Sequence, residues 1–383
     1  MGAFTGQLRS NEIFSALYNM IISQEVFADN LGKHQTLVDK ARVDGGLYGD
    51  TKLYYSTDVL KSAPWGPAMG IAEQTEANNL LALHRPDAPE CQAIHLDQFR
   101  QICLTVDNYL SKRAWSDEGA FSSFNSIMLG WMGETKKVYD GTLYNVFIGT
   151  TETNVGKQIA NIDISTARGS ASSEEEANRL EAEAIAQGIA DLLVEMGDYS
   201  RDFNDYANLR SYANDAIKVI WNSKYVNKIK KIDLPTIFNK EGLVDKFDQE
   251  VLPARYFGRA IAASDIGEGK VIGADGAYDS TKGTLRAKKE FDYNNVHYFP
   301  GDALATSGTY VAVVGGLEAS DVYLEQDDII AKVVVKLPPY MSAFEVGTSF
   351  FNPKSLTENH YLTFGHNTIE YLKNYPFITV KKI

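Results

Sequence analysis

The sequence lacks most of the features that define secreted, membrane and enzyme classes. Its 383 residues include only two cysteines, Cys91 and Cys103, which are too few for a disulfide framework and fit a reducing compartment. No run of eighteen apolar residues occurs, so no transmembrane helix is predicted. The N-terminal segment has no basic region followed by an unbroken apolar core, and a secretory signal is therefore not expected.

Motifs for catalysis and metal binding are also missing. The six histidines form no HExxH motif and no zinc pattern with cysteine. No GxSxG elbow occurs, and residues 45–49 (GGLYG) and 267–273 (GEGKVIG) lack the spacing of a phosphate-binding loop. The sequence therefore predicts no catalytic residue, no metal site and no cofactor. An enzyme whose catalytic carboxylates lie far apart in the chain stays open, because such pairs leave no short motif.

Positive charge is scarce. The formal net charge is −13, whereas a protein whose main task is to grip a phosphate backbone normally has a basic face. The one basic cluster consists of Lys224, Lys228, Lys230 and Lys231. On a short amphipathic helix a solvated face is the favoured interpretation of such a cluster, and contact with nucleic acid or an acidic neighbour is the alternative.

The most prominent feature that is present is a long helical pattern over residues 117–150. Apolar residues recur there mostly three or four positions apart, which predicts one helix about 50 Å long. A second helix is predicted from Ser173, because Ser173 and Glu176 have the spacing of a capping box. Strands are predicted at 51–60, 100–106, 157–166, 216–222 and 328–339, and the last has the composition of a strand buried on both faces.

Two further segments shape the predicted architecture. Residues 13–22 have the pattern of an amphipathic helix, with apolar positions at Ile13, Phe14, Leu17, Tyr18, Ile21 and Ile22. Residues 34–105 contain short strand-like pieces separated by glycines and prolines, which is unusual inside a compact domain. Two interpretations stay open from the pattern: an arm that packs on neighbouring subunits, or an irregular β-rich domain.

This order of parts resembles a major capsid protein of a tailed bacteriophage with the HK-ninety-seven capsid fold. Local similarity lies in residues 11–23 (NEIFSALYNMIIS), 37–55 (LVDKARVDGGLYGDTKLYY), 216–239 (AIKVIWNSKYVNKIKKIDLPTIFN) and 371–382 (YLKNYPFITVKK). The resemblance implies an α+β fold with an N-terminal arm, an extended loop, a long spine helix in a peripheral domain, and an axial domain.

The resemblance also implies a division of the chain. It assigns 1–33 to the N-terminal arm, 34–104 to the extended β-rich loop, 105–169 to the peripheral domain with its spine helix at about 117–150, 170–338 to the axial domain, and 339–383 to a C-terminal return to the peripheral domain. Residues 260–325 are expected to be an elaborated axial loop or an insertion. The candidate contacts between subunits are Phe14, Leu17, Ile21, Tyr54, Tyr55, Trp65, Arg85, Lys224 and Lys228.

The expected function follows from the same resemblance. The chain would assemble with itself into pentamers and hexamers of an icosahedral shell, made in the host bacterial cytoplasm. The shell would enclose double-stranded DNA without sequence-specific contacts. A separate scaffolding protein, a portal and a decoration protein are the expected partners. No membrane contact and no covalent crosslink through lysine and asparagine are expected. An encapsulin-like compartment and another virion protein stay open beside the enzyme already named.

Overall fold

The computed structural model describes residues 36–46, 50–62, 85–106, 118–226, 248–261, 276–279, 283–293, 295–304, 310–313 and 319–383. Its helices are α2 (Thr36–Ala41), α5 (Glu118–Thr150), α6 (Ile164–Gly169) and α7 (Glu174–Gly197). Its strands are β1 (Arg42–Asp44), β2 (Lys52–Ser56), β3 (Glu90–Ile94), β4 (Leu96–Val106), β5 (Ile159–Ile162), β6 (Lys218–Asn222), β7 (Asp248–Leu252), β8 (Gly258–Arg259), β9 (Gly276–Asp279), β10 (Leu285–Ala287), β11 (Phe291–Tyr293), β12 (Val296–Tyr298), β13 (Tyr310–Val313), β14 (Val322–Glu325), β15 (Ile329–Val334), β16 (Tyr340–Asn352), β17 (Thr357–Asn367) and β18 (Phe377–Lys382).

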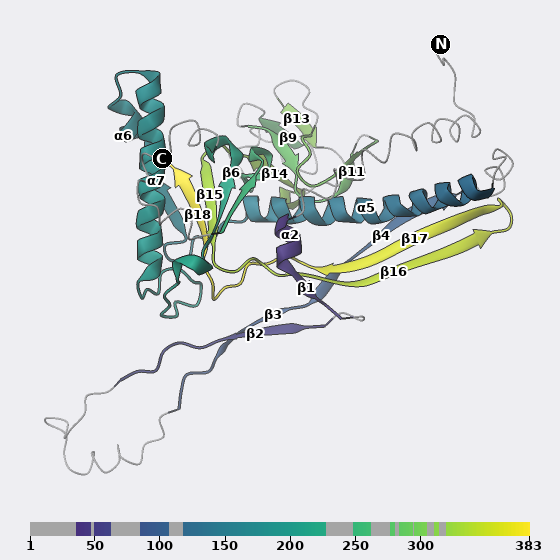
Figure 1. Cartoon of the computed structure of the whole chain (residues 1–383), viewed down its shortest axis with the longest axis horizontal. Helices are drawn as coiled ribbons and strands as arrows, with labels where there is room; N and C mark the ends of the chain where they lie inside the picture. Colours follow the sequence, from purple (N-terminus) through teal and green to yellow (C-terminus); the bar gives the residue numbers. More distant parts are fainter. Residues whose placement is uncertain are drawn as a thin grey trace.

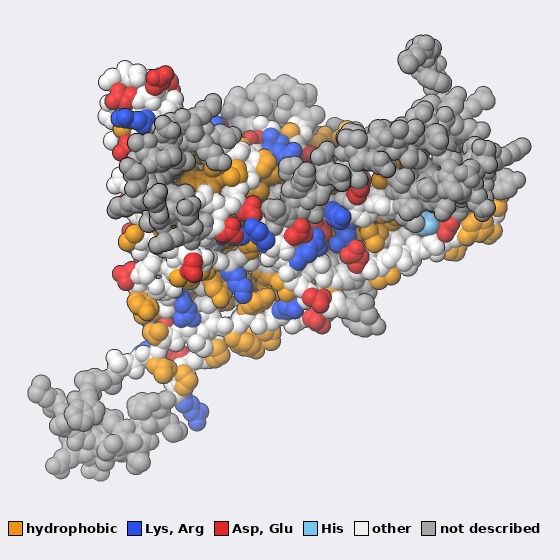
Figure 2. Space-filling model, in the orientation of Figure 1, with side chains coloured by type: hydrophobic (Ala, Val, Ile, Leu, Met, Phe, Trp, Pro, Cys, Tyr) orange, Lys and Arg blue, Asp and Glu red, His pale blue; other side chains and the backbone are white. Residues whose placement is uncertain are grey.

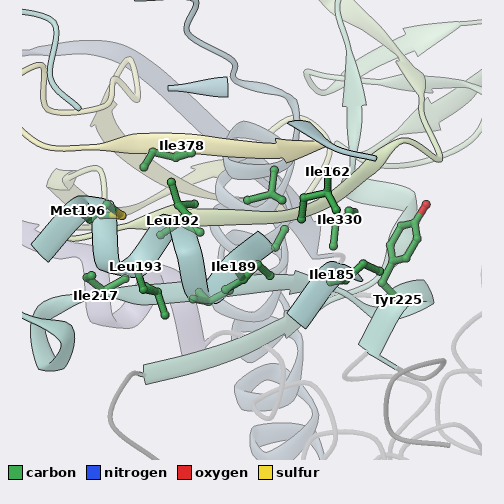
Figure 3. Close-up of a cluster of buried hydrophobic side chains, with 14 of the residues drawn as sticks. Ile162, Ile185, Ile189, Leu192, Leu193, Met196, Ile217, Tyr225, Ile330 and Ile378 are labelled. Atoms are coloured by element: carbon green, nitrogen blue, oxygen red, sulfur yellow. The ribbon is translucent and has the colours of Figure 1, made fainter. Parts of the chain in front are cut away.

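A five-stranded sheet in the order β5-β18-β15-β6-β7 forms one end of the molecule. One of its faces packs against α7, and Figure 3 shows Ile185, Ile189 and Leu192 of this helix beside Ile330 and Ile378 of the sheet. The residues adjacent to Ile330 and Ile378 on the same strands point to the opposite face of the sheet. There they form a second hydrophobic cluster with Tyr144 and Ile148 of α5 and with residues of α2. The sheet is therefore covered on both faces, as the composition of residues 328–339 predicts.

The long helix α5 leaves this sheet and runs along a second, four-stranded sheet in the order β1-β16-β17-β4 (Figure 1). The bounds of α5, Glu118–Thr150, agree with the predicted helix at 117–150. The strands β16 and β17 form a long antiparallel hairpin, and β4 pairs with β17 along its whole length. Among the described helices, none is long and apolar enough to cross a membrane.

A third feature is the two-stranded ribbon of β2 and β3, which lies on the side of the four-stranded sheet opposite α5 (Figure 1). Small sheets of β10-β14-β8, β11-β12 and β13-β9 lie on the other side of α5. They fall in residues 258–325, most of which the sequence assigns to an elaborated loop or insertion.

One local prediction differs from the structure. Residues 157–166 are not one strand: β5 ends at Ile162, and α6 begins at Ile164 because the Asp163 carboxylate accepts a hydrogen bond from the Thr166 amide, which is an N-cap. The strand β4 belongs to the four-stranded sheet and not to the β2–β3 ribbon, although most of it falls in the predicted loop 34–104. The strand β18 joins the five-stranded sheet beside β15, away from the β16–β17 hairpin. The domain boundaries themselves stay predictions.

The predicted start of the second helix is confirmed. The helix α7 begins at Glu174, and the Ser173 hydroxyl accepts a hydrogen bond from the Glu176 amide. In return, the Glu176 carboxylate accepts from the Ser172 amide, one residue earlier than a capping box requires. The three glutamates of the first turn lie where the helix dipole favours negative charge.

Candidate interaction surfaces

The two faces of the β2–β3 ribbon differ in burial. Leu53 is 51% exposed and Tyr55 is 64% exposed, whereas the alternate residue Tyr54 packs with Ile94 and Met341 of its own chain. The cross-strand partners of Leu53 and Tyr55 are Ala93 and Cys91, and both of these are exposed as well. Leu53, Tyr55, Cys91 and Ala93 form the outward face of the ribbon, and this face carries no charged side chain. An exposed apolar face is typical of a protein–protein contact.

The inward face of the ribbon is held by hydrogen bonds at its base. The Asn208 side-chain amide donates to the Ser56 hydroxyl over 2.7 Å, and this hydroxyl donates to the side-chain oxygen Oδ1 of Asn374 over 2.5 Å. The Gln92 amide donates to the backbone carbonyl of Tyr371 over 3.0 Å. Because Ser56 and Gln92 are buried, these bonds fix which face of the ribbon points away from the subunit.

A charged contact extends the anchor just beyond β2. The Asp58 carboxylate accepts from the Leu209 amide over 2.9 Å and from the Arg201 guanidinium over 2.6 Å. These bonds, led by the one from Leu209, lower the pKa of Asp58 to about 2. The Arg210 guanidinium donates to the Thr57 carbonyl on the same segment. The loop after α7 therefore sets the angle at which the ribbon leaves the body.

A buried polar cluster fastens α5 to the four-stranded sheet. The side chain of Asp140 is fully buried and accepts hydrogen bonds from Tyr340 (2.6 Å), Arg42 (3.2 Å) and Lys136 (3.3 Å). Burial, together with the nearby Asp140 charge, raises the pKa of Tyr340 well above its ordinary value, so this phenol remains a donor. Each polar group of this cluster is committed to a partner within the chain, which is the arrangement of a structural cluster.

Two hollows on the surface of the described residues offer no catalytic arrangement. One of about 660 Å³ lies beside the end of α7 and is lined by Val59, Tyr199, Arg210 and small or polar neighbours, with no carboxylate, histidine or cysteine. Another of about 490 Å³ lies between α5 and the β16–β17 hairpin and carries Glu345 and His360. Among the residues that the structure describes, no group of three histidine, cysteine or acidic side chains could hold a metal ion.

The residues predicted from the sequence fall into three groups. Tyr55 lies on the outward face of the ribbon, Arg85 is exposed where the chain returns toward β3, and Tyr54 faces its own subunit. Lys224 forms an ion pair with Asp327 over 2.6 Å while its side chain stays 40% exposed. Phe14, Leu17, Ile21, Trp65 and Lys228 lie outside the described residues. The contact role of all nine stays a prediction.

The sequence pattern did not identify Leu53, Cys91 and Ala93 as candidates for contact between subunits. The alternation of apolar and polar residues in 51–56 could have pointed to Leu53 and Tyr55 as one face. The partners on β3 lie almost forty positions away, and no local pattern shows which residues of the two strands are opposite each other.

Comparison with known proteins shows which solved structures have a similar fold. No protein-family model and no curated protein matches the sequence. The structure is similar to a chain of the capsid of Staphylococcus phage Andhra, with a TM-score of 0.53 and 10% identity over 90% of this chain and 83% of that chain. A chain in the structure of the head fiber and inner core protein gp22 of native bacteriophage P68 gives a TM-score of 0.55 and 11% identity over the same shares. These two similarities show that the chain shares the fold of phage capsid structures, and its described helices and sheets confirm the expected α+β class.

Proposed function

We propose that this chain is the major capsid protein of a tailed bacteriophage with double-stranded DNA, and that its copies assemble into an icosahedral shell around the genome. The observation that carries the proposal is the capsid-protein fold over 90% of the chain. The β2–β3 ribbon supports it, because the apolar side chains of Leu53 and Tyr55 on its outward face are exposed in the subunit and would gain burial from a neighbour. The scarcity of catalytic arrangements in the described part supports a structural role.

The proposal includes the domain assignment that the resemblance implies. The five-stranded sheet with α7 would form the axial domain at the centre of pentamers and hexamers. The helix α5 with the four-stranded sheet would form the peripheral domain, and the β2–β3 ribbon would be the extended loop that overlaps the next subunit. A net charge of −13 suits a shell whose interior does not bind DNA tightly while the genome is driven in.

The test is negative-stain electron microscopy of the purified chain, alone and co-expressed with its neighbouring genes. Closed shells or capsomer sheets are expected in at least one condition, with a scaffolding protein as the partner that improves closure. A monodisperse monomer or small oligomer in every condition would overturn the proposal. Shells that contain a cargo enzyme instead of nuclease-protected DNA would identify an encapsulin-like compartment.

A deletion variant tests the role of the extended loop in the same assay. Removal of residues 61–90 is expected to leave a folded subunit that forms no shells, because the chain loses the part that reaches a neighbour. Circular dichroism and thermal melting report whether the variant folds. Shells of normal size from this variant would contradict the role of the loop.

A further inference from the structure

The end of α7 and the loop that follows it carry a dense negative charge. Residues 191–215 contain six carboxylates and two arginines, a net charge of −4, and the whole chain carries −13. On the helix, Asp191, Val194 and Asp198 follow one another at intervals of three and four residues, so their side chains lie on one face. The exposed Val194 therefore lies between two carboxylates on the surface of α7.

The two arginines of this region already have partners in the chain. The Arg201 guanidinium donates to the Asp58 carboxylate over 2.6 Å, and the Arg210 guanidinium donates to the backbone carbonyl of Thr57. Both groups are thus used to hold the segment after β2 against the loop after α7. Their positive charge is not directed at the face of α7 that carries Val194.

Three carboxylates of the same region are not neutralised. Asp191, Asp198 and Asp215 are exposed, and within the described part of the chain no lysine, arginine or histidine forms an ion pair with them. The Asp198 carboxylate accepts a hydrogen bond from the adjacent Tyr199 amide over 2.7 Å, which leaves its charge in place. This end of the molecule therefore attracts a cationic partner.

Large apolar side chains are exposed beside these carboxylates. Val194 is 72% exposed, Tyr199 is 73% exposed and Leu60 is 78% exposed. Val59 and Tyr199 line the hollow of about 660 Å³ at the end of α7. Figure 2 shows hydrophobic side chains with acidic ones among them along the lower left edge of the molecule, where Figure 1 places the end of α7. An exposed apolar surface with a polar rim is typical of a site for a protein partner.

Hydrogen bonds fix the walls of this hollow. The Tyr212 amide donates to the Met196 carbonyl over 2.9 Å, and the Ser211 hydroxyl donates to the Gly197 carbonyl over 2.8 Å. Ser200 and Arg210 exchange two backbone hydrogen bonds, each 2.9 Å long, across the loop. The hollow is therefore formed before a partner arrives, which reduces the entropy cost of binding.

A second copy of the chain is a poor match for this surface. Each copy carries a net charge of −13, and contact between two negative surfaces is repulsive. In the described part of the one basic cluster, Tyr225 and Val226 are buried inside the subunit, and Lys224 already pairs with Asp327. A different protein is therefore the expected occupant.

We propose that the end of α7 is a docking site for a basic amphipathic segment of another protein. An apolar side chain of that segment enters the hollow beside Val59 and Tyr199, and its lysines or arginines lie next to Asp191 and Asp198. We call these four residues, together with Val194, the α7 site. The site is a surface of the single subunit, so it can be tested whether or not shells form.

Two synthetic peptides test the α7 site on the purified chain. One is an amphipathic helix of leucine and lysine, and the other has glutamate at every lysine position; fluorescence anisotropy measures their binding. The lysine peptide is expected to bind, with an affinity that falls as salt is added, and the glutamate peptide is expected not to bind. A double variant, Asp191→Lys with Asp198→Lys, is expected to weaken binding of the lysine peptide about tenfold or more.

The matched control is the double variant Glu175→Lys with Glu183→Lys. It makes the same change of charge at two exposed positions of the same helix, farther from its end. The control is expected to bind the lysine peptide as the wild type does. Equal losses in both double variants, or no loss in either, would overturn the α7 site.

A photo-crosslink identifies the occupant when the chain is co-expressed with its neighbouring genes. The variant Val194→p-benzoylphenylalanine is irradiated, and mass spectrometry identifies the crosslinked product. A product with a second protein, joined through a segment rich in lysine or arginine and apolar residues, is expected. The control Glu175→p-benzoylphenylalanine, near the other end of α7, is expected to give no such product.

The remaining outcomes of the crosslink overturn the proposal. A product with another copy of this chain would show a contact between copies at Val194, and the absence of any product would show that no protein occupies the site. A failure to form shells would count against the proposed function alone, because the peptide measurement reports on the α7 site without them.

Discussion

The Lys332 ammonium nitrogen lies 2.7 Å from the backbone carbonyl oxygen of Thr151, directly after the last residue of α5. Lys332 is in the middle of the five-stranded sheet, is fully buried, and also donates to the Thr379 hydroxyl over 2.8 Å. A cation at this place is favoured by the dipole of α5. One side chain therefore joins the end of the long helix to the strands β15 and β18.

Lys332→Met is expected to change how stability depends on pH. Burial lowers the pKa of Lys332 to about 7 in the folded chain, whereas the unfolded chain has the ordinary value of 10.5. Between these values the unfolded state binds more protons, so the wild type gains stability as pH rises from 7. The free energy of unfolding of the wild type, relative to that of Lys332→Met, is expected to rise by at most about 1.4 kcal/mol per pH unit. Thermal melting from pH 7 to 9.5 measures it.

The control for Lys332 is Lys157→Met, which replaces a lysine whose side chain is 60% exposed. Its melting curve should follow the wild type at every pH. Parallel curves for wild type and Lys332→Met over the same range would mean that the buried amine keeps its proton in the folded chain.

Two glycines of α5 are expected to respond to alanine in opposite directions. A Cβ atom at Gly149 would lie 2.1 Å from the Tyr256 carbonyl oxygen, which is backbone and has to move. Gly149→Ala is therefore expected to lose about 3 kcal/mol of the free energy of unfolding. Gly130 has nothing within 4 Å of that position, and Gly130→Ala is expected to gain about 0.5–1 kcal/mol from helix propensity.

Chemical denaturation of both glycine variants decides between these expectations. The pair shares one helix, so a general effect of alanine on α5 would move both in the same direction. Equal shifts of the same sign would show that α5 and the turn at Tyr256 are not in close backbone contact.

Local signals explain why so much of the helical architecture can be predicted. The periodicity of residues 117–150 and the cap at Ser173 are properties of a few neighbouring residues, and both helices begin within a residue of the predicted position. The strand at 329–334 is recognisable because every residue in it is buried. Trp131, one of the apolar positions of the helical pattern over 117–150, is only partly buried in the structure.

Non-local pairing explains what cannot be predicted. The strands β4 and β17, about 250 positions apart in the chain, lie opposite each other with Cys103 beside Tyr361. A shift of one residue in that register would exchange the outer face for the face toward α5. Tyr54 and Tyr55 illustrate the same limit, since composition treats them alike and only the pairing with β3 sends one inward and the other outward.

His366 is expected to make the folded subunit sensitive to acid. Its Nδ1 lies 2.8 Å from the backbone carbonyl of Asn367 and donates to it, and in the neutral ring Nε2 accepts from the Tyr139 hydroxyl at 2.9 Å. Burial lowers the pKa of His366 below 6.5. The unfolded chain binds the extra proton first, and stability is therefore lost as pH falls below about 6.5.

The variant His366→Phe keeps the ring that stacks on Tyr340 but cannot be protonated. Its melting temperature is expected to be lower than that of the wild type at pH 7.5, because the Tyr139 hydroxyl loses its acceptor at a cost of about 1–3 kcal/mol. The deficit should shrink toward pH 5. A deficit that is constant with pH would show that the histidine is already charged in the folded chain.

His297 is expected to act in the opposite direction. It lies between two carboxylates, 2.7 Å from Asp292 and 2.8 Å from Glu290, and Glu290 in turn pairs with Arg100 of β4 over 3.2 Å. Partial burial opposes the charged ring, but the hydrogen bonds and charges of the two carboxylates outweigh it and raise the pKa of His297 above 6.5. The folded chain then binds more protons, so this contribution is present below pH 6.5 and is lost as pH rises through the raised pKa.

His297→Asn removes that titration, and its melting temperature relative to the wild type should be lowest at pH 6 and recover toward pH 8.5. The ring is about half exposed, so salt should weaken the effect, which separates it from the buried His366. The two variants measured in one pH series therefore control each other, because their deficits should change with pH in opposite directions. A His297→Asn deficit that grows with pH would mean that the two carboxylates bind the ring in its neutral form.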